Sequence, residues 1–163
     1  MKIQIFIDTV CGWCFIGSQR LHLALQKFNH NFEIIYVPFQ LNPTMSEDGM
    51  NREEYIIGKF GSMENAKPMY DSMASEAKKE NLEFNLSNIK KTPNTVVSHI
   101  LIDVARKHQV QKETVFDIFS NYFIQGLDIG DKNNLIKIGT NHGIKSEELS
   151  REFDSEENIE KVN

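Results

Sequence analysis

The sequence predicts an α/β fold in which one βαβ unit at the N-terminus precedes roughly a hundred mostly helical residues. Isoleucines alternate with other residues in "KIQIFID" (2–8), a pattern typical of a strand that is buried on at least one side. The run "FEIIYVPF" (32–39) is β-branched and aromatic, which predicts a second strand. A strand, a helix and a strand in so short a span predict two parallel strands joined by a right-handed crossover.

The helix between these strands is expected to run to about residue 29. Apolar residues recur along it at i, i+3, i+4 and i+7, which predicts one buried stripe. The stripe consists of Leu21, Ala24, Leu25 and Phe28.

Further along the chain the apolar residues recur at helical spacing, and no further strand is expected. Pro68 can be accommodated only in the first turn of its helix, because proline has no N–H to donate. Gly126 and Gly143 are expected to stop helices, and Asp131 is expected to cap one. Residues after 153 are either a frayed end or the start of another helix. The expected helices span 51–60, 65–81, 93–108, 112–125, 131–143 and 145–153.

Composition and charge exclude several classes of protein. Of the 163 residues, 40% are hydrophobic and 25% are charged, as in folded globular domains. The formal net charge of -5 repels a polyanionic backbone, so no nucleic-acid partner is expected. The first residues do not read as a secretory signal, and no apolar run approaches the length of a membrane span. We therefore expect a cytoplasmic protein with no membrane partner.

The chain has two cysteines, Cys11 and Cys14, and they lie where the first strand ends and the helix begins. The first turn of a helix offers free backbone N–H groups and a partial positive charge, which stabilise a thiolate. We therefore expect a lowered pKa for Cys11, which makes it the nucleophile. Cys14, about one turn further on, is placed to resolve a mixed disulfide.

Three interpretations of this pair stay open at the level of sequence. In a reducing compartment a lone CxxC motif is typical of a redox centre or of a metal site. A zinc site needs two further ligands, and the five histidines show no paired metal-ligand spacing, so no metal is expected. The third interpretation is that Cys11 and Cys14 are packed without a chemical role.

Two neighbours of the pair are further candidates. Asp8 precedes Cys11 by three residues, and its carboxylate can relay the proton of Cys14 or bond nearby backbone groups. Trp13, the only tryptophan, either contacts the substrate beside the sulfur atoms or begins the helix against the core.

Several ordered motifs resemble one known family. The segments "DTVCGWCFIG", "PFQLNPTM" and "TPNTVVSHILIDVA" look like those of cytosolic DsbA-like oxidoreductases of the FrnE type. These enzymes are related to 2-hydroxychromene-2-carboxylate isomerases and kappa-class glutathione transferases. The resemblance continues through "KFGSMENA", "ENLEFN" and "YFIQGLDIGDKNNL", and so covers nearly the whole chain.

The resemblance implies a thioredoxin-like fold with a large helical insertion, and thiol-disulfide exchange at Cys11 and Cys14. The implied division is a βαβ unit at 1–45, a helical insertion at 46–153, and an acidic tail or the start of a return helix at 154–163. Asn94, Thr95 and His99 lie in the matching "NT" segment and are candidates for the substrate groove. Capping of the next helix is the alternative for Asn94 and Thr95, and a half-buried structural role is the alternative for His99.

The sequence departs from the family pattern at its C-terminal end. Family members return from the insertion through a "GVP" loop with a cis proline and then add two strands and a helix; here no such segment precedes Asn163, so the C-terminal strands are expected to be missing. A fragment, a truncated gene, and a chain that completes its sheet with a partner stay open as explanations. Because an exposed strand edge invites pairing, a homodimer is a reasonable expectation.

Three functions follow from these features. The leading one is a thiol-disulfide oxidoreductase or isomerase acting on protein or peptide thiols, with no tightly bound cofactor. The second is a non-catalytic module that binds peptides or a partner. The third is an isomerase or transferase that uses glutathione as a cosubstrate.

Overall fold

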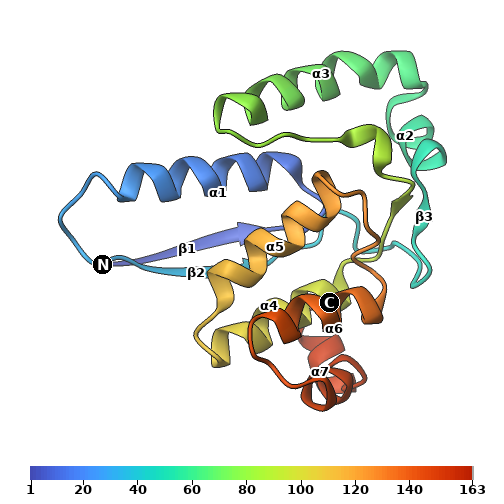
Figure 1. Cartoon of the computed structure of the whole chain (residues 1–163). Helices are drawn as coiled ribbons and strands as arrows, with labels where there is room; N and C mark the ends of the chain where they lie inside the picture. The colour runs from blue at the N-terminus through green and yellow to red at the C-terminus, as the bar shows by residue number, and fades with distance from the viewer. Residues whose placement is uncertain (163) are drawn as a thin grey trace.

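The computed structural model describes residues 1–162 and contains the predicted βαβ unit (Figure 1). Strands β1 (Lys2–Ile7) and β2 (Glu33–Pro38) are parallel, with Ile5 opposite Tyr36. Helix α1 (Gly12–Leu25) connects them. The alternation of isoleucines in β1 therefore predicted its structure correctly.

The predicted buried stripe of α1 is wrong. The buried residues of this helix are Gly12, Phe15, Ile16 and Ser18, all in its first half. Ala24 is exposed and Phe28, which lies beyond the end of the helix, is 59% exposed. The reason is tertiary: the first half of α1 enters the core between α3 and α5, whereas the second half, which lies over a sheet of two strands, reaches these helices through polar side chains such as Arg20 with Glu76 and His22 with Lys112 (Figure 1).

The rest of the described chain is mostly helical, and each predicted helix is present. The ends of these helices differ from the predicted ones by a few residues, which is usual for boundaries. Of the last residues, Glu156–Val162 form a helix, as one of the two expectations for the end of the chain had it. The helices are α2 (Arg52–Phe60), α3 (Met63–Lys79), α4 (Val96–Lys107), α5 (Gln111–Phe123), α6 (Lys132–Asn141), α7 (Ser146–Phe153) and α8 (Glu156–Val162), with a 3-10 turn at Leu86–Asn88.

Two expectations about the helical part are corrected. Two further strands exist, β3 (Met50–Asn51) and β4 (Lys91–Thr92), which form a short antiparallel pair. Two residues cannot show an alternating pattern, so no sequence signal marks them. Pro68 lies inside α3 and not in its first turn, because Ser62 caps the helix early by accepting the Asn65 N–H (3.1 Å).

The residue predicted to cap the start of α6 and the two glycines predicted to stop helices are confirmed. Asp131 caps α6 by accepting the N–H of Asn133 at 2.7 Å. Gly126 and Gly143 have φ of 75° and 81°, a left-handed conformation that ends the preceding helices at little cost.

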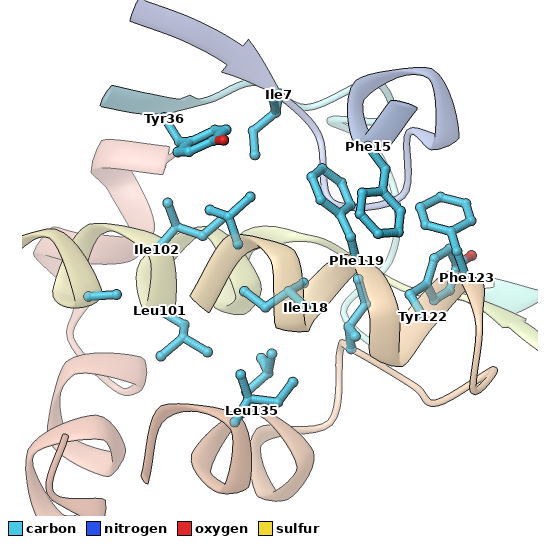
Figure 2. Packing of buried hydrophobic residues seen from close by; sticks show 14 of the residues in the cluster. Ile7, Phe15, Tyr36, Leu101, Ile102, Ile118, Phe119, Tyr122, Phe123 and Leu135 are labelled. Atoms are coloured by element: carbon cyan, nitrogen blue, oxygen red, sulfur yellow. The ribbon is translucent and has the colours of Figure 1, made fainter. Parts of the chain in front are cut away.

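A continuous core joins the βαβ unit to the helices (Figure 2). The ring of Phe15 in α1 stacks on Phe119 of α5, with ring centroids 4.9 Å apart, and on Phe84, at 5.6 Å. The side-chain amide of Gln111 in α5 accepts the N–H of Tyr36 and donates to its carbonyl, both at 3.0 Å. These contacts hold the start of α1 against the helical part. The division of the chain at 45/46 and 153/154 stays a prediction.

Candidate active site

Cys11 and Cys14 lie at the start of α1, where the loop from β1 enters the helix. Cys11 is the N-cap residue, and its N–H donates to the carbonyl of Asp8 at 3.0 Å. Its Sγ accepts the backbone N–H of Cys14 at 3.2 Å, as a serine or aspartate oxygen does at other helix starts. Both residues are free thiols and are half-buried.

The two thiols differ in acidity for physical reasons that are visible in this geometry. The hydrogen bond from the Cys14 thiol lowers the pKa of Cys11, and the backbone N–H groups of Cys14 and Trp13 act in the same direction, against burial and the charge of Asp8. The same thiol hydrogen bond and burial raise the pKa of Cys14. Cys11 is therefore the more acidic of the pair, in the direction that the sequence predicts.

Asp8 lies beneath the pair and is 1% exposed. Its Oδ2 accepts the N–H of Leu41 at 2.7 Å, and its Oδ1 accepts the N–H of Val10 at 3.5 Å. Asp8 therefore bonds nearby backbone, which was one of its two interpretations. Its negative charge nevertheless reaches both cysteines, since it raises the pKa of each.

His99 is neither on a groove nor half-buried, so both interpretations of it are corrected. It is 0% exposed, and its Nε2 lies 3.5 Å from Asp8 Oδ1. The cause is the packing of α4 beneath the loop that follows β1, where the Thr9 and Ser98 hydroxyls also meet at 2.8 Å. Sequence reasoning named Asp8 and His99 separately and had no signal that they meet.

The other candidates from the "NT" segment, Asn94 and Thr95, do not line the cavity that contains Cys11, and Asn94 lines a separate cavity of about 460 Å³. Asn94 accepts the N–H of Val96 at 2.9 Å, which satisfies a donor at the start of α4, and donates to the carbonyl of Met45 at 2.8 Å. Thr95 is the N-cap residue of α4, but its side chain makes no capping bond and is buried. The capping interpretation is thus correct for Asn94. Thr95 occupies the N-cap position, but its side chain makes no capping hydrogen bond.

A cleft of about 230 Å³ opens beside Cys11, and Trp13, which is 43% exposed, lines it. Its other walls include four aromatic side chains and two methionines. Two cations, Arg52 and Lys59, also line it. Arg52 donates to Thr92 Oγ1 at 3.0 Å, and Lys59 Nζ lies 5.4 Å from the centre of the Tyr55 ring.

These α2 residues were missed in the sequence. The signal was their spacing, because Arg52, Tyr55 and Lys59 recur at i, i+3 and i+7 and so share one face of a helix. The sequence did not indicate that this face would turn toward Cys11. Arg52 also donates to the hydroxyl of Tyr70 at 2.9 Å, which joins α2 to α3 at the cleft.

No group of three or more histidine, cysteine or acidic side chains within residues 1–162 is arranged to hold a metal ion. Within the same residues, no helix is long and apolar enough to cross a membrane.

The sequence model of the family described as DSBA-like thioredoxin domain matches residues 2–163. The chain belongs to this family. The DsbA-like chain is 24% identical over 148 residues to the uncharacterized protein YwbO of Bacillus subtilis, an alignment that covers 88% of this chain and 67% of YwbO.

Solved structures show the same fold as this DsbA-like chain. A probable DsbA oxidoreductase from Streptomyces coelicolor superposes with a TM-score of 0.88 at 22% identity, over 99% of this chain and 71% of that one. A 2-hydroxychromene-2-carboxylate isomerase gives 0.75 at 13% identity, over 99% and 75%. The cytosolic disulfide reductase DsbM from Pseudomonas aeruginosa gives 0.66 at 14% identity, over 99% and 74%. The expected thioredoxin-like fold with a large helical insertion is confirmed.

Proposed function

We propose that this DsbA-like chain is a thiol-disulfide oxidoreductase or disulfide isomerase that acts on protein or peptide thiols. The observation that carries the proposal is the N-cap position of Cys11, whose Sγ accepts the Cys14 N–H at 3.2 Å. A sulfur atom in this position is stabilised as a thiolate, which is the form that attacks a disulfide. Membership of the DsbA-like family supports the same class of chemistry.

The proposed exchange has two steps. The Cys11 thiolate attacks one sulfur of a substrate disulfide, so a mixed disulfide forms and the other substrate sulfur leaves as a thiolate. Asp8 then accepts the proton of Cys14, and the Cys14 thiolate attacks Cys11 Sγ. The Cys11–Cys14 disulfide forms, the bond to the substrate breaks, and two electrons have passed to the substrate. Trp13, at the mouth of the cleft, contacts the substrate.

The test is a titration combined with an exchange assay. We expect Cys11 to alkylate at a pH below that of an ordinary cysteine, and the protein to catalyse disulfide exchange faster than an equal concentration of a small dithiol. Cys11→Ser abolishes exchange, whereas Cys14→Ser accumulates the mixed disulfide. The proposal would be wrong if Cys11 had an ordinary pKa and the protein exchanged disulfides no faster than the small dithiol does.

Glutathione is a second candidate, as a cosubstrate, because two cations line the cleft beside Cys11. Arg52 and Lys59 can bind the carboxylates of a short acidic peptide, and glutathione carries two. DsbM, which shares the fold, has been solved with GSH. We expect the Cys11→Ser/Cys14→Ser double variant to bind glutathione, and Lys59→Gln to weaken that binding; Lys67→Gln, outside the cleft, is the control.

The same double variant tests the non-catalytic alternative. If the chain were a peptide-binding module, binding of a cysteine-free peptide would persist in this variant and exchange activity would be absent from the wild-type protein. We also propose a cytoplasmic location, because a reducing compartment keeps Cys11 and Cys14 available as thiols.

A further inference from the structure

A buried pair of titratable side chains lies directly beneath the CxxC motif. Asp8 is 1% exposed and His99 is 0% exposed, and His99 Nε2 lies 3.5 Å from Asp8 Oδ1. Within residues 1–162, neither ring nitrogen of His99 has a hydrogen-bond partner. Buried polar groups are nearly always paired, so an imidazole aimed at a single buried carboxylate calls for an explanation.

The pair is held in place by its neighbours in the chain. Thr9 follows Asp8 and Ser98 precedes His99, and their hydroxyl oxygens are hydrogen bonded at 2.8 Å. Ser98 Oγ in turn donates to the carbonyl of Thr95 at 2.8 Å, so the Thr9 hydroxyl is the donor to Ser98. This clamp joins the end of β1 to the first turn of α4. It fixes the separation of Asp8 and His99.

No other acid competes for His99 along its own helix. Asp103, one turn further along α4, is paired with Lys161 at 2.5 Å. Three nitrogen atoms lie within 3.5 Å of the Asp8 carboxylate: the backbone nitrogens of Leu41 and Val10, which donate hydrogen bonds to it, and His99 Nε2. A buried carboxylate is costly to ionise unless donors surround it, and the imidazole is the only side chain among these three.

We propose that His99 is a positioning residue for the resolving step: its Nε2, 3.5 Å from Asp8 Oδ1, orients the buried carboxylate to accept the Cys14 proton. The inference rests on the proposed oxidoreductase function. The Cys14 S–H proton passes to Asp8, and the Cys14 thiolate displaces the substrate thiolate from Cys11. His99 exchanges neither electrons nor protons with the substrate. It acts on the second step and not on the attack by Cys11.

The test measures attack and resolution separately, with glutathione disulfide as the probe. Reduced protein is mixed with the probe and quenched with acid, and mass spectrometry measures the glutathionylated form. We expect His99→Phe to leave the rate of attack unchanged and to slow resolution roughly tenfold, because Asp8 loses the imidazole that faces it and its carboxylate is no longer held toward Cys14, so the mixed disulfide accumulates. His108→Phe is the matched control, since His108 pairs with Glu148 at 2.9 Å on the surface.

Three further variants separate positioning from a structural role. Asp8→Asn should also accumulate the mixed disulfide, and adding His99→Phe to it should cause no further slowing, because both act on one proton transfer. His99→Gln, whose amide can still donate to Asp8, should recover part of the rate. Unchanged resolution in a folded His99→Phe variant, or additive effects in the double variant, would overturn the inference.

A measurement on the wild-type protein covers the case in which the His99 variants fail to fold. Long-range 1H–15N NMR spectra distinguish the two imidazole tautomers, and the signals of His99 can be assigned by removing the other four histidines one at a time. We expect a proton on Nε2. A proton on Nδ1 alone would overturn the inference. Wild-type protein that does not react with glutathione disulfide would instead overturn the proposed function, and this inference with it.

Discussion

Gly12, between Cys11 and Trp13, occupies a position where a side chain has no room. A Cβ atom built there would lie 2.4 Å from Met73 Sδ, 3.2 Å from a carbon of Phe84 and 3.3 Å from one of Phe123. The close approach of α1 to these side chains is what brings the helix start, and with it Cys11, against the cleft. Gly17, later in the same helix, has no atom within 4 Å of its built Cβ and makes a matched comparison.

Gly12→Ala is therefore expected to lower the free energy of unfolding by about 1–3 kcal/mol through overpacking. Gly17→Ala should raise it by about 0.5–1 kcal/mol, because alanine favours the helix more than glycine does. Urea unfolding of the reduced proteins measures both. Equal stability of the two variants would show that Met73 moves aside at no cost.

The acidity of Cys11 depends on one neighbour more than on any other. Cys14→Ala removes the thiol whose hydrogen bond is the largest cause of the lowered pKa, so we expect the pKa of Cys11 to rise. Because the thiolate is the reactive form, half-maximal alkylation by iodoacetamide then moves to higher pH. Cys14→Ser keeps an O–H donor and should keep part of the shift. Identical pH profiles for wild type and Cys14→Ala, measured on the Cys11 peptide, would contradict this account.

At the scale of elements, α1 is anchored by its first half. Phe15 is 1% exposed and packs on aromatic rings from α5 and from the segment after α3 (Figure 2). None of residues 19–25, in the second half of α1, is buried. The helix therefore presents a well-packed N-terminus to the substrate. This is the end at which free N–H groups and the helix dipole act on Cys11.

Phe15→Ala is expected to cost about 3–5 kcal/mol of unfolding free energy, because it opens a cavity among stacked rings. Phe28→Ala removes the same side chain from a site that is 59% exposed and should change stability by about 0.5 kcal/mol or less. Chemical denaturation followed by circular dichroism compares the two. If Phe28→Ala lowered the free energy of unfolding as much as Phe15→Ala does, Phe28 would have to be part of the hydrophobic core.

At the scale of the whole molecule, one core spans the βαβ unit and the helices. The contacts of Phe15 with Phe119 and of Gln111 with Tyr36 cross the predicted boundary at 45/46. Gln111 is 7% exposed. Its side-chain amide forms two hydrogen bonds with the backbone of Tyr36 in β2, as a neighbouring strand would. The two parts are therefore expected to lose their structure together.

Trp13 fluorescence reports on the βαβ unit and far-ultraviolet circular dichroism on the helices. We expect the two signals to give one midpoint in urea. Gln111→Leu, which leaves the Tyr36 N–H and carbonyl without their partner, should lower that single midpoint by the equivalent of about 1–3 kcal/mol. Gln125→Leu is the control. Two separate midpoints in the wild-type protein would instead mean that 1–45 and 46–153 fold independently.

The sequence by itself determined the strand at the N-terminus, the order of the helices and the position of Cys11 at a helix start. These features depend on periodicity and capping, which are local. Only the tertiary structure decided that Asp8 faces His99, that Arg52 and Lys59 turn toward the cysteines, and which half of α1 is buried. Thr9 and Ser98, which clamp the first of these contacts, are 89 positions apart. Contacts at such separation depend on how whole helices pack, and a periodic pattern shows which face is apolar but not what covers it.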